Sequence, residues 1–482
     1  MNGSSDSRVR SGTPGLDDVL RGGFVPGQTT VVTGGPGTGK TLLALQFLTA
    51  GEESLYIGFE EDDGSLRKNA ESVGVDLSDV EILDLSSKGE RFFNENAYSI
   101  FPPDEVEGES LLETIATAID EHEPSRLVID PLSELRALLP DEFQFRRNIS
   151  SLFNELRQRG VTTLCTTQYT EANPEADLQF LGDVTLELRR STRHRTVEVT
   201  KFRGSDTQSG RHTYRITDGD GARVYPKLVP GDHLRETDRD QLRSGIDGLD
   251  ELLGGGIERG SVTVVSGPSG VGKTTTGSQF LMTAAEQDER ATAFLFEELR
   301  SDYLYRSGRI GMPMRSLAET GGLELKEVEA LSLGADEFAH QVREAVETRD
   351  VRLVMLDGTA GYRLALRGDD SHDGLTRELH ALCRYLKRMG VTVILIEEVR
   401  NITGEFTATN EQISYLADNI VFLRYIEIDG EIRKAIGVLK KRFGDFEGSL
   451  RELDIGADGL HVGEPLTGLG GLLTGTPGHT RG

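Results

Sequence analysis

One segment of about thirty residues occurs twice in this chain, and that repeat constrains the fold more than any other feature. Residues 11–41 and 244–274 align without a gap at an offset of 233, and 17 of their 31 positions are identical. Similarity at that level indicates tandem duplication, so the 482 residues consist of two copies of one module. The length also favours two domains, because single cores rarely grow beyond about 250–300 residues.

Apolar strands recur in the same order within each copy. RLVID (126–130) is matched by RLVMLD (352–357), and VTTLCTTQ (161–168) by VTVILIEE (391–398). Continuous Val/Ile/Leu runs that alternate with helical stretches are typical of a parallel sheet buried on both sides. The sequence therefore predicts an α/β fold in each module, with a mostly parallel central sheet and helices on both faces.

A polar, charged stretch at 227–243 separates the two copies. We predict domains at 1–235 and 236–462, followed by a flexible Gly/Thr-rich tail at 463–482.

The composition indicates the kind of cellular compartment in which the protein works. The formal charge is 53 − 80 = −27, and only 11 of the 53 basic residues are lysine, which we interpret as adaptation to a salt-rich, halophilic cytoplasm. Two cysteines far apart, Cys165 and Cys383, exclude a disulfide framework and fit a reducing compartment. No apolar run reaches the 18 residues of a membrane span, and the polar N-terminus lacks a signal-peptide core. We therefore expect a cytoplasmic protein that does not contact membranes.

The strongest chemical signal is the pattern G-x-x-x-x-G-K-[ST], which follows an apolar strand and opens a helix in both copies. Glycines let successive backbone N–H groups surround phosphates, while the lysine reaches the β- and γ-phosphates and the hydroxyl serves Mg²⁺. The predicted nucleotide-binding residues of the first copy are Gly34, Gly35, Pro36, Gly37, Thr38, Gly39, Lys40 and Thr41. Those of the second copy are Gly267, Pro268, Ser269, Gly270, Val271, Gly272, Lys273 and Thr274.

An aspartate ends one later apolar strand in each copy. Asp130 and Asp357 end hydrophobic strands 90 and 84 residues after the loop lysines, where an α/β sheet places its ligand crevice. Together with Thr41 and Thr274, they are the predicted Mg²⁺ ligands.

Two acidic pairs, Glu60–Glu61 and Glu297–Glu298, also lie at expected strand ends. A carboxylate there could deprotonate the attacking water, and strand alternation lets only one member of each pair face the γ-phosphate.

A K-x-R pattern on a late strand of each copy supplies candidate catalytic cations. Lys201 and Arg203 form the first pair, and Lys440 and Arg442 the second. Alternation places both cations of a pair on one face, from which they could act on a neighbouring subunit's γ-phosphate as arginine fingers do.

With these motifs in place, the whole chain resembles the KaiC family of circadian clock ATPases, which have the RecA-type fold. The segment IVFLRYIEIDGEIRKAIGVLKKRFG (420–444) is especially close to the second module of that family. The resemblance implies ATP bound at the subunit interfaces of a homo-hexameric double ring. It further implies slow hydrolysis, with the glutamate pair as base and the K-x-R cations acting in trans.

The resemblance also implies autophosphorylation of the second module on an adjacent Ser-Thr pair. The aligned residues here are Ser414, the predicted phosphoacceptor, and Tyr415, which replaces the threonine. In the first module the corresponding residues are Gln179 and Phe180, which carry no hydroxyl.

Two other interpretations remain open. A RecA/RadA-like recombination ATPase shares the core fold, although no helix-hairpin-helix module or basic-aromatic groove is visible, so a nucleic-acid partner is not expected. A signalling scaffold whose ATP state controls protein partners is compatible with the enzyme interpretation.

Overall fold

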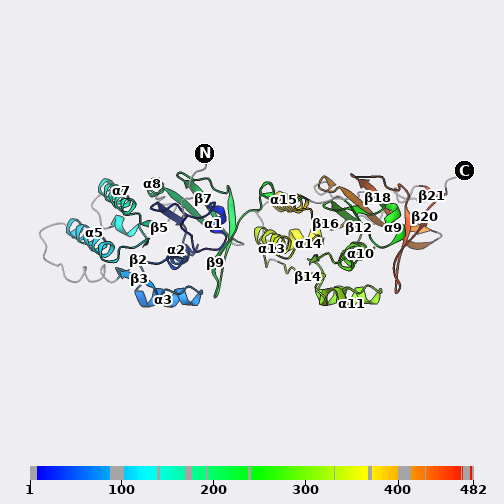
Figure 1. Ribbon diagram of the computed structural model, residues 1–482, viewed down its shortest axis with the longest axis horizontal. Helices are drawn as coiled ribbons and strands as arrows, with labels where there is room; N and C mark the ends of the chain where they lie inside the picture. The colour runs from blue at the N-terminus through cyan, green and yellow to red at the C-terminus, as the bar shows by residue number, and fades with distance from the viewer. Residues whose placement is uncertain are drawn as a thin grey trace. The chain divides into compact units, whose positions relative to one another are not determined.

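The computed structural model describes most of the chain, in the following segments: residues 8–86, 103–137, 142–168, 176–191, 194–236, 240–330, 332–366, 372–399, 414–428, 430–467, 469–470 and 478–479. The chain divides into two compact units, Met1–Lys227 and Leu228–Gly482 (Figure 1).

The first unit is built on a nine-stranded sheet with the order β3-β2-β4-β5-β1-β6-β7-β8-β9. Its strands are β1 (Thr29–Gly34), β2 (Ser54–Gly58), β3 (Val80–Asp84), β4 (Arg126–Asp130), β5 (Thr162–Gln168), β6 (Val184–Arg190), β7 (Arg195–Phe202), β8 (Arg211–Thr217) and β9 (Gly221–Tyr225). The six strands from β3 to β6 in this order are parallel. From β6 to β9 the sheet continues as antiparallel hairpins.

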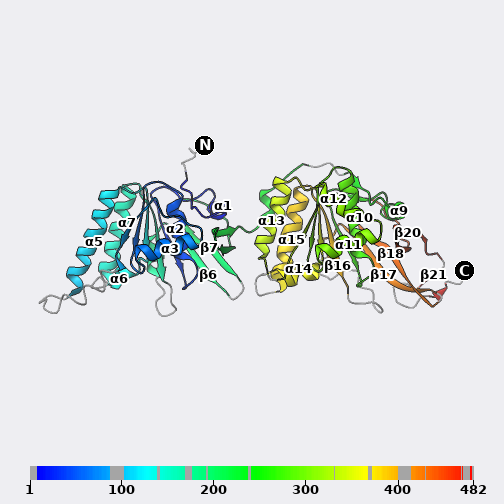
Figure 2. The ribbon, with the colours of Figure 1, turned by 90° about the horizontal axis from the view of Figure 1, so that it is seen from below.

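Helices cover both faces of this sheet (Figure 2). They are α1 (Leu16–Val19), α2 (Lys40–Thr49), α3 (Asp63–Ser72), α5 (Pro103–His122), α6 (Glu134–Ala137), α7 (Glu142–Gln158) and α8 (Ala176–Leu181). Successive strand residues enter opposite cores: Tyr56 packs with α1–α3, whereas Leu55 and Ile57 pack with α5–α8. This alternation explains why the strand sequences are continuously apolar.

The second unit repeats the topology, with the order β14-β13-β15-β16-β12-β17-β18-β19-β20. Its sheet strands are β12 (Val262–Gly267), β13 (Ala291–Leu295), β14 (Leu323–Glu327), β15 (Leu353–Asp357), β16 (Thr392–Glu398), β17 (Asn419–Ile428), β18 (Glu431–Lys441), β19 (Arg451–Gly456) and β20 (Gly459–Pro465). A short antiparallel pair, β10 (Gln241–Leu242) with β11 (Ile257–Glu258), lies outside the sheet.

Two helix layers again enclose the sheet. One core contains α9 (Asp247–Leu252), α10 (Lys273–Glu286), α11 (Arg300–Arg309) and α12 (Met314–Glu319). The other contains α13 (Ala335–Thr348), α14 (Thr359–Ala365) and α15 (His372–Arg388). The predicted tandem α/β fold is thus confirmed in both copies.

The segment that leads into the second unit packs on α15. The Arg388 Nε donates to the carbonyl oxygen of His233 (2.8 Å), and the His233 ring meets the Tyr385 ring edge-on with centroids 4.9 Å apart. Residues 228–235, assigned to the first domain from the sequence, therefore make their contacts with the second unit.

At the C-terminus, β20 continues to Pro465, three residues into the tail predicted from the sequence. Beyond it, β21 (Leu469–Gly470) pairs with β22 (Gly478–His479). Among the described residues, no helix combines the length and the apolar character needed to cross a bilayer.

Candidate functional site

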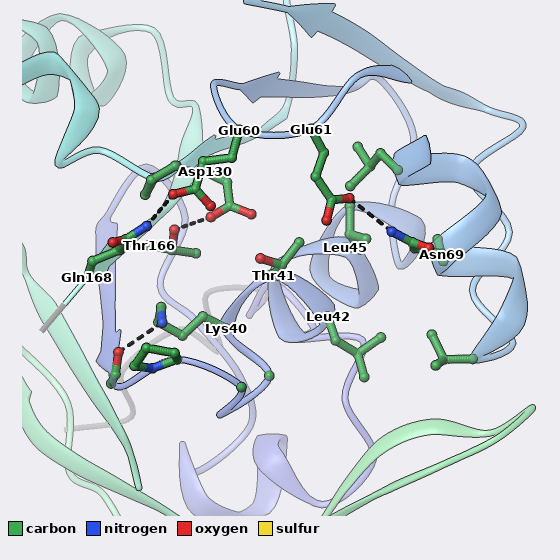
Figure 3. A pocket seen from close by; sticks show the side chains of 18 residues that line it. Lys40, Thr41, Leu42, Leu45, Glu60, Glu61, Asn69, Asp130, Thr166 and Gln168 are labelled. Atoms are coloured by element: carbon green, nitrogen blue, oxygen red, sulfur yellow. Dashed lines mark hydrogen bonds between the residues drawn. The ribbon is translucent and has the colours of Figure 1, made fainter. Parts of the chain in front are cut away.

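The residues predicted to bind phosphate and Mg²⁺, together with the glutamate pairs, gather at one edge of each sheet. In the first unit the Gly-rich loop follows β1, and Asp130 and Gln168 close the parallel strands β4 and β5. These groups line a pocket of about 470 Å³ together with Lys40, Glu60 and Glu61 (Figure 3). The carboxyl ends of parallel strands are where open α/β sheets bind ligands.

Backbone geometry in the first loop depends on glycine. Gly39, the residue before α2, has φ 93°, and a Cβ there would lie 2.7 Å from Cδ1 of Ile216. The Lys40 Nζ donates to the carbonyl oxygens of Gly34 (2.8 Å) and Gly35 (3.1 Å). The lysine ammonium and the N-terminus of α2 thus share one concave loop, an arrangement that favours bound phosphate.

The second loop has the same construction in a more buried setting. Gly272 precedes α10 with φ 113°, and the Lys273 Nζ donates to the carbonyl oxygen of Pro268 (2.8 Å). Burial lowers the pKa of Lys273, while the nearby Glu398 and Asp357 act in the opposite direction.

Two hydroxyl groups hold the Asp130 carboxylate at the end of β4. Its carboxylate accepts hydrogen bonds from the Tyr56 hydroxyl (2.9 Å) and from the Thr166 hydroxyl. Burial, followed by the charge of Asp130, raises the pKa of Tyr56, which therefore stays a donor. Figure 3 shows the Thr41 hydroxyl in the same pocket as this carboxylate.

In the second unit the corresponding pair is in direct contact. The Thr274 hydroxyl donates to Oδ1 of Asp357 (2.9 Å). Burial raises the pKa of Asp357 to about 6, against the hydrogen bond from Thr274, which lowers it. A hydroxyl beside a carboxylate is the oxygen donor set that Mg²⁺ prefers.

The glutamate pairs lie just beyond the strands rather than on them, because β2 ends at Gly58 and β13 at Leu295. In the first unit the two side chains diverge (Figure 3). Glu60 accepts a hydrogen bond from Gln168, whereas Glu61 accepts one from Nδ2 of Asn69 (3.2 Å). Burial raises the pKa of Glu60, and the charge of Asp130 adds to this effect.

The second pair also diverges. The Glu297 Oε1 accepts a hydrogen bond from the backbone N–H of Gly361 (3.1 Å), at the start of α14 and four residues after Asp357. Glu298 turns to α11 and forms a bidentate ion pair with Arg306, at 3.1 and 2.8 Å. Glu60 thus contacts the residue that ends β5, whereas Glu297 contacts the first turn of α14. The second glutamate of each pair contacts a different helix, α3 or α11.

The K-x-R cations do not join these groups. Lys201 donates from Nζ to three carbonyl oxygens around the end of α8, those of Gln179 (3.1 Å), Phe180 (3.0 Å) and Gly182 (2.7 Å). Arg203 lies 3.5 Å from a carboxylate oxygen of Asp183. In the second unit, Lys440 donates to the carbonyl oxygens of Ser414 (3.3 Å) and Ala417 (2.7 Å), and Arg442 pairs with Asp418 (3.0 Å). Burial and the adjacent arginine lower the pKa of each lysine.

Hydrogen bonding fixes these cations at the opposite edge of the sheet from their own phosphate loop. The Arg203 N–H donates to the carbonyl oxygen of Asp183, whose own N–H donates to that of Thr29, the first residue of β1. The loop begins at Gly34, five residues on, which is roughly 16 Å at the usual strand rise. Arg442, Asp418 and Val262 make the same two bonds in the second unit.

Ser414 shares this opposite edge, since its carbonyl oxygen contacts Lys440. Its neighbour Tyr415 is 53% exposed and lies against the His380 ring of α15, with centroids 5.4 Å apart. In the first unit, Phe180 is 74% exposed at the matching position.

The buried aspartates Asp183 and Asp418 were not predicted as functional groups. Asp418 is fully buried and accepts hydrogen bonds from the Val262 N–H (3.0 Å), the Lys387 Nζ (2.6 Å) and Arg442. Asp183 has the matching partners Thr29, Arg157 and Arg203. The duplication carried the signal, because both aspartates occur at one position of the repeated segments LGDVTLELRR (181–190) and LADNIVFLRY (416–425).

We expect Asp418→Ala to destabilise the second unit by roughly 2–3 kcal/mol, because it leaves a buried N–H without its charged acceptor. Hydrogen exchange of the β12 and β17 amides should report the loss, with the sheet of the first unit as internal reference. The exposed Asp458→Ala is the control, with an effect below about 0.5 kcal/mol. Equal exchange rates in both variants would contradict the anchoring role of Asp418.

The amino-acid sequence is similar to those of known proteins, and these similarities identify a family. The family model described as "ATPase: KaiC" matches residues 9–229 and again residues 242–467. The chain is 28% identical to the circadian clock protein KaiC3 of Synechocystis sp., over 98% of this chain and 95% of that protein. It is 30% identical to the circadian clock oscillator protein KaiC of Thermosynechococcus vestitus, over 96% of this chain and 90% of that protein. For the KaiC of Synechococcus elongatus the identity is 28%, over 98% and 92% of the two chains.

Proposed function

The chain belongs to the KaiC family of ATPases, and from this premise we propose that both modules hydrolyse ATP at sites shared between adjacent subunits of a homo-hexameric ring. The observation that carries this proposal is the separation described above. In both units the phosphate loop and the K-x-R pair occupy opposite edges of one sheet. A subunit cannot complete its own site, but its neighbour can.

The loop residues support binding of the triphosphate. Lys40 and Lys273 would exchange their carbonyl partners for phosphate oxygens, and the N–H groups at the starts of α2 and α10 would donate to the same anion. Thr41 with Asp130, and Thr274 with Asp357, would hold Mg²⁺, which when bound neutralises charge on the β- and γ-phosphates. The described residues contain no cluster of three or more His, Cys, Asp or Glu suited to a metal. That suits Mg²⁺, which commonly relies on one or two protein oxygens, water and substrate phosphates.

Glu60 and Glu297 are the proposed general bases. Each is the first member of its pair. Glu60 contacts Gln168 at the end of β5, and Glu297 contacts the first turn of α14, four residues beyond Asp357. The second member of each pair turns toward α3 or α11. Burial raises the pKa of Glu60, which brings it closer to working pH, where a carboxylate is more effective at accepting a proton from water.

The K-x-R cations are proposed to act in trans. The side chains of Arg203 and Arg442 are 57% and 49% exposed, so a neighbour's γ-phosphate could approach them. Their pairing with a buried aspartate fixes the position of each guanidinium before the subunits meet.

We further propose that the second module phosphorylates itself on Ser414. Because Ser414 lies beside Lys440, the hydroxyl would reach the same neighbouring γ-phosphate that this cation serves. A serine held in line could then compete with water. The first module lacks a hydroxyl at this place, so it would act in hydrolysis and assembly only.

We expect incubation with ATP and Mg²⁺ to place phosphate on the second module alone, chiefly on Ser414. Ser414→Ala should remove most of the label, as mapped by mass spectrometry, while ATP hydrolysis by the first module continues. Ser316→Ala, an exposed serine on α12, is the matched control and should keep the label. Wild-type protein without phosphate near residue 414 after long incubation would rule out the autokinase and leave the ATPase proposal standing.

Family membership favours a ring ATPase over the recombination factor that the sequence left open. A signalling role through protein partners, within a clock or elsewhere, is compatible with the proposal, and the ATP state of the ring would then be the signal.

A further inference from the structure

A compact polar cluster flanks the phosphate loop of the second unit, on the side of α10 that faces α11. Arg306 is its centre: the guanidinium binds Glu298 through two hydrogen bonds (3.1 and 2.8 Å) and donates to the Thr275 hydroxyl (3.2 Å). It also lies over the Tyr303 ring, 5.5 Å from the centroid. A bidentate, charge-assisted pair of this kind fixes both orientation and distance.

The cluster is anchored to the first turn of α10. The hydroxyl of the fully buried Tyr303 lies 2.6 Å from that of Ser278, which donates to the carbonyl oxygen of Thr274 (2.7 Å). Thr274 is the proposed Mg²⁺ ligand, and Thr275 follows it. Arg306 therefore connects Glu298 to the turn of helix that starts the phosphate site.

The first unit keeps the glutamate and the loop threonine, as Glu61 and Thr41, but differs at the four residues that surround them. Counted from the loop lysine, Leu42 and Leu45 replace Thr275 and Ser278. Counted from the glutamate pair, Leu66 and Asn69 replace Tyr303 and Arg306. Glu61 is exposed and accepts its hydrogen bond from the neutral amide of Asn69, and the leucines line the pocket beside it (Figure 3).

Burial and charge explain why the second site needs a cation here. The side chain of Glu298 is only 25% exposed, so water screens its charge less than that of Glu61. ATP–Mg²⁺ is anionic, so an uncompensated carboxylate at this place would oppose its binding.

We propose that Arg306 is a positioning residue of the second nucleotide site: it holds Glu298 against α11, away from Glu297, and cancels the charge of that carboxylate. The inference rests on the proposed function in so far as ATP is the ligand. It assigns to Arg306 a task that the first module, whose Glu61 is exposed to water, does not require of Asn69.

The test isolates the second site in full-length Lys40→Ala protein and measures ATP–Mg²⁺ affinity by titration calorimetry. Arg306→Asn, which installs the first module's residue, should raise Kd on the order of tenfold, because Glu298 is then unpaired near the triphosphate. In Glu298→Gln protein the same substitution should change Kd by less than about twofold. Arg306→Lys keeps the charge and should stay within about threefold of the parent. Arg309→Asn removes an exposed arginine from the same helix and is the control.

The outcomes separate the inference from the function on which it rests. If Arg306→Asn cost as much affinity in the Glu298→Gln protein as in the parent, the inference would be overturned, since a merely structural arginine is not rescued by removing a carboxylate. A parent that binds ATP without hydrolysing it would refute the hydrolysis proposed above and leave the test of Arg306 intact. A parent that does not bind ATP would overturn both.

Discussion

Replacing Lys273 by alanine is expected to remove one of two ATP molecules from each chain and leave the other in place. Lys40→Ala should do the same at the first site, and the double variant should bind none. The expected loss is large because the lysine is the only basic residue of each eight-residue loop, and the energy of a charged hydrogen bond to phosphate is lost outright. Equilibrium dialysis with ATP and Mg²⁺, followed by determination of bound nucleotide per chain, measures the result.

The matched control is Lys227→Ala, at the exposed end of the first unit. It should retain two nucleotides. If the double lysine variant still bound two nucleotides, the phosphate loops would not be the nucleotide sites.

Mixing two inactive proteins is expected to restore activity. In a Lys273→Ala background, Glu60→Gln chains lack the base of the first site, and Arg203→Ala chains lack the cation proposed to act on a neighbour. An active interface needs the loop of an Arg203→Ala chain facing the Arg203 edge of a Glu60→Gln chain. Random assembly of equal amounts produces this at about a quarter of interfaces, so about a quarter of the parent ATPase rate should return.

Two observations keep that experiment decisive. Arg223→Ala chains, which lose an exposed arginine of β9, should hydrolyse ATP without mixing. The mixture must also have the mass of the parent oligomer in light scattering. Intact mixed oligomers without recovered activity would contradict an action of Arg203 across the interface.

The features that the sequence predicted well are those encoded locally. The duplication and the continuously apolar strands required two α/β units, and strand-end motifs on parallel strands had to meet at one edge. These inferences need only the neighbours of each residue along the chain.

The predicted strand ends were less accurate, because β2 stops at Gly58 and the chain turns toward α3 before Glu60. The Phe59 N–H makes the last bond toward β4, with the carbonyl oxygen of Asp130, and the chain then turns into α3, which Asp62 caps through the Ser65 N–H (3.0 Å). The contact with Asp130 is not visible in the alternation of apolar residues.

The pairing of charged side chains could not be predicted, because it also depends on contacts between residues that are distant in the sequence. Arg306 lies eight positions after Glu298, on a helix that many polar sequences could form. The ion pair between the two side chains depends on how that helix packs against α10. The aspartate at 183 and 418 could have been recognised from its recurrence, but its partners at 157 and 387 come from a helix whose position the sequence does not specify.

The placement of phosphate loop and K-x-R pair at opposite edges has a consequence for stoichiometry. If the cations act in trans as proposed, the contacts between copies are heterologous, with the loop edge of one copy facing the cation edge of the next, and the assembly has a direction. For either module, an open assembly of n copies would contain n − 1 complete sites. Only closure into a ring would supply the last site. In the proposed ring, the loss of a single subunit would break its contacts with both neighbours, so the ATPase rate per chain would depend on protein concentration.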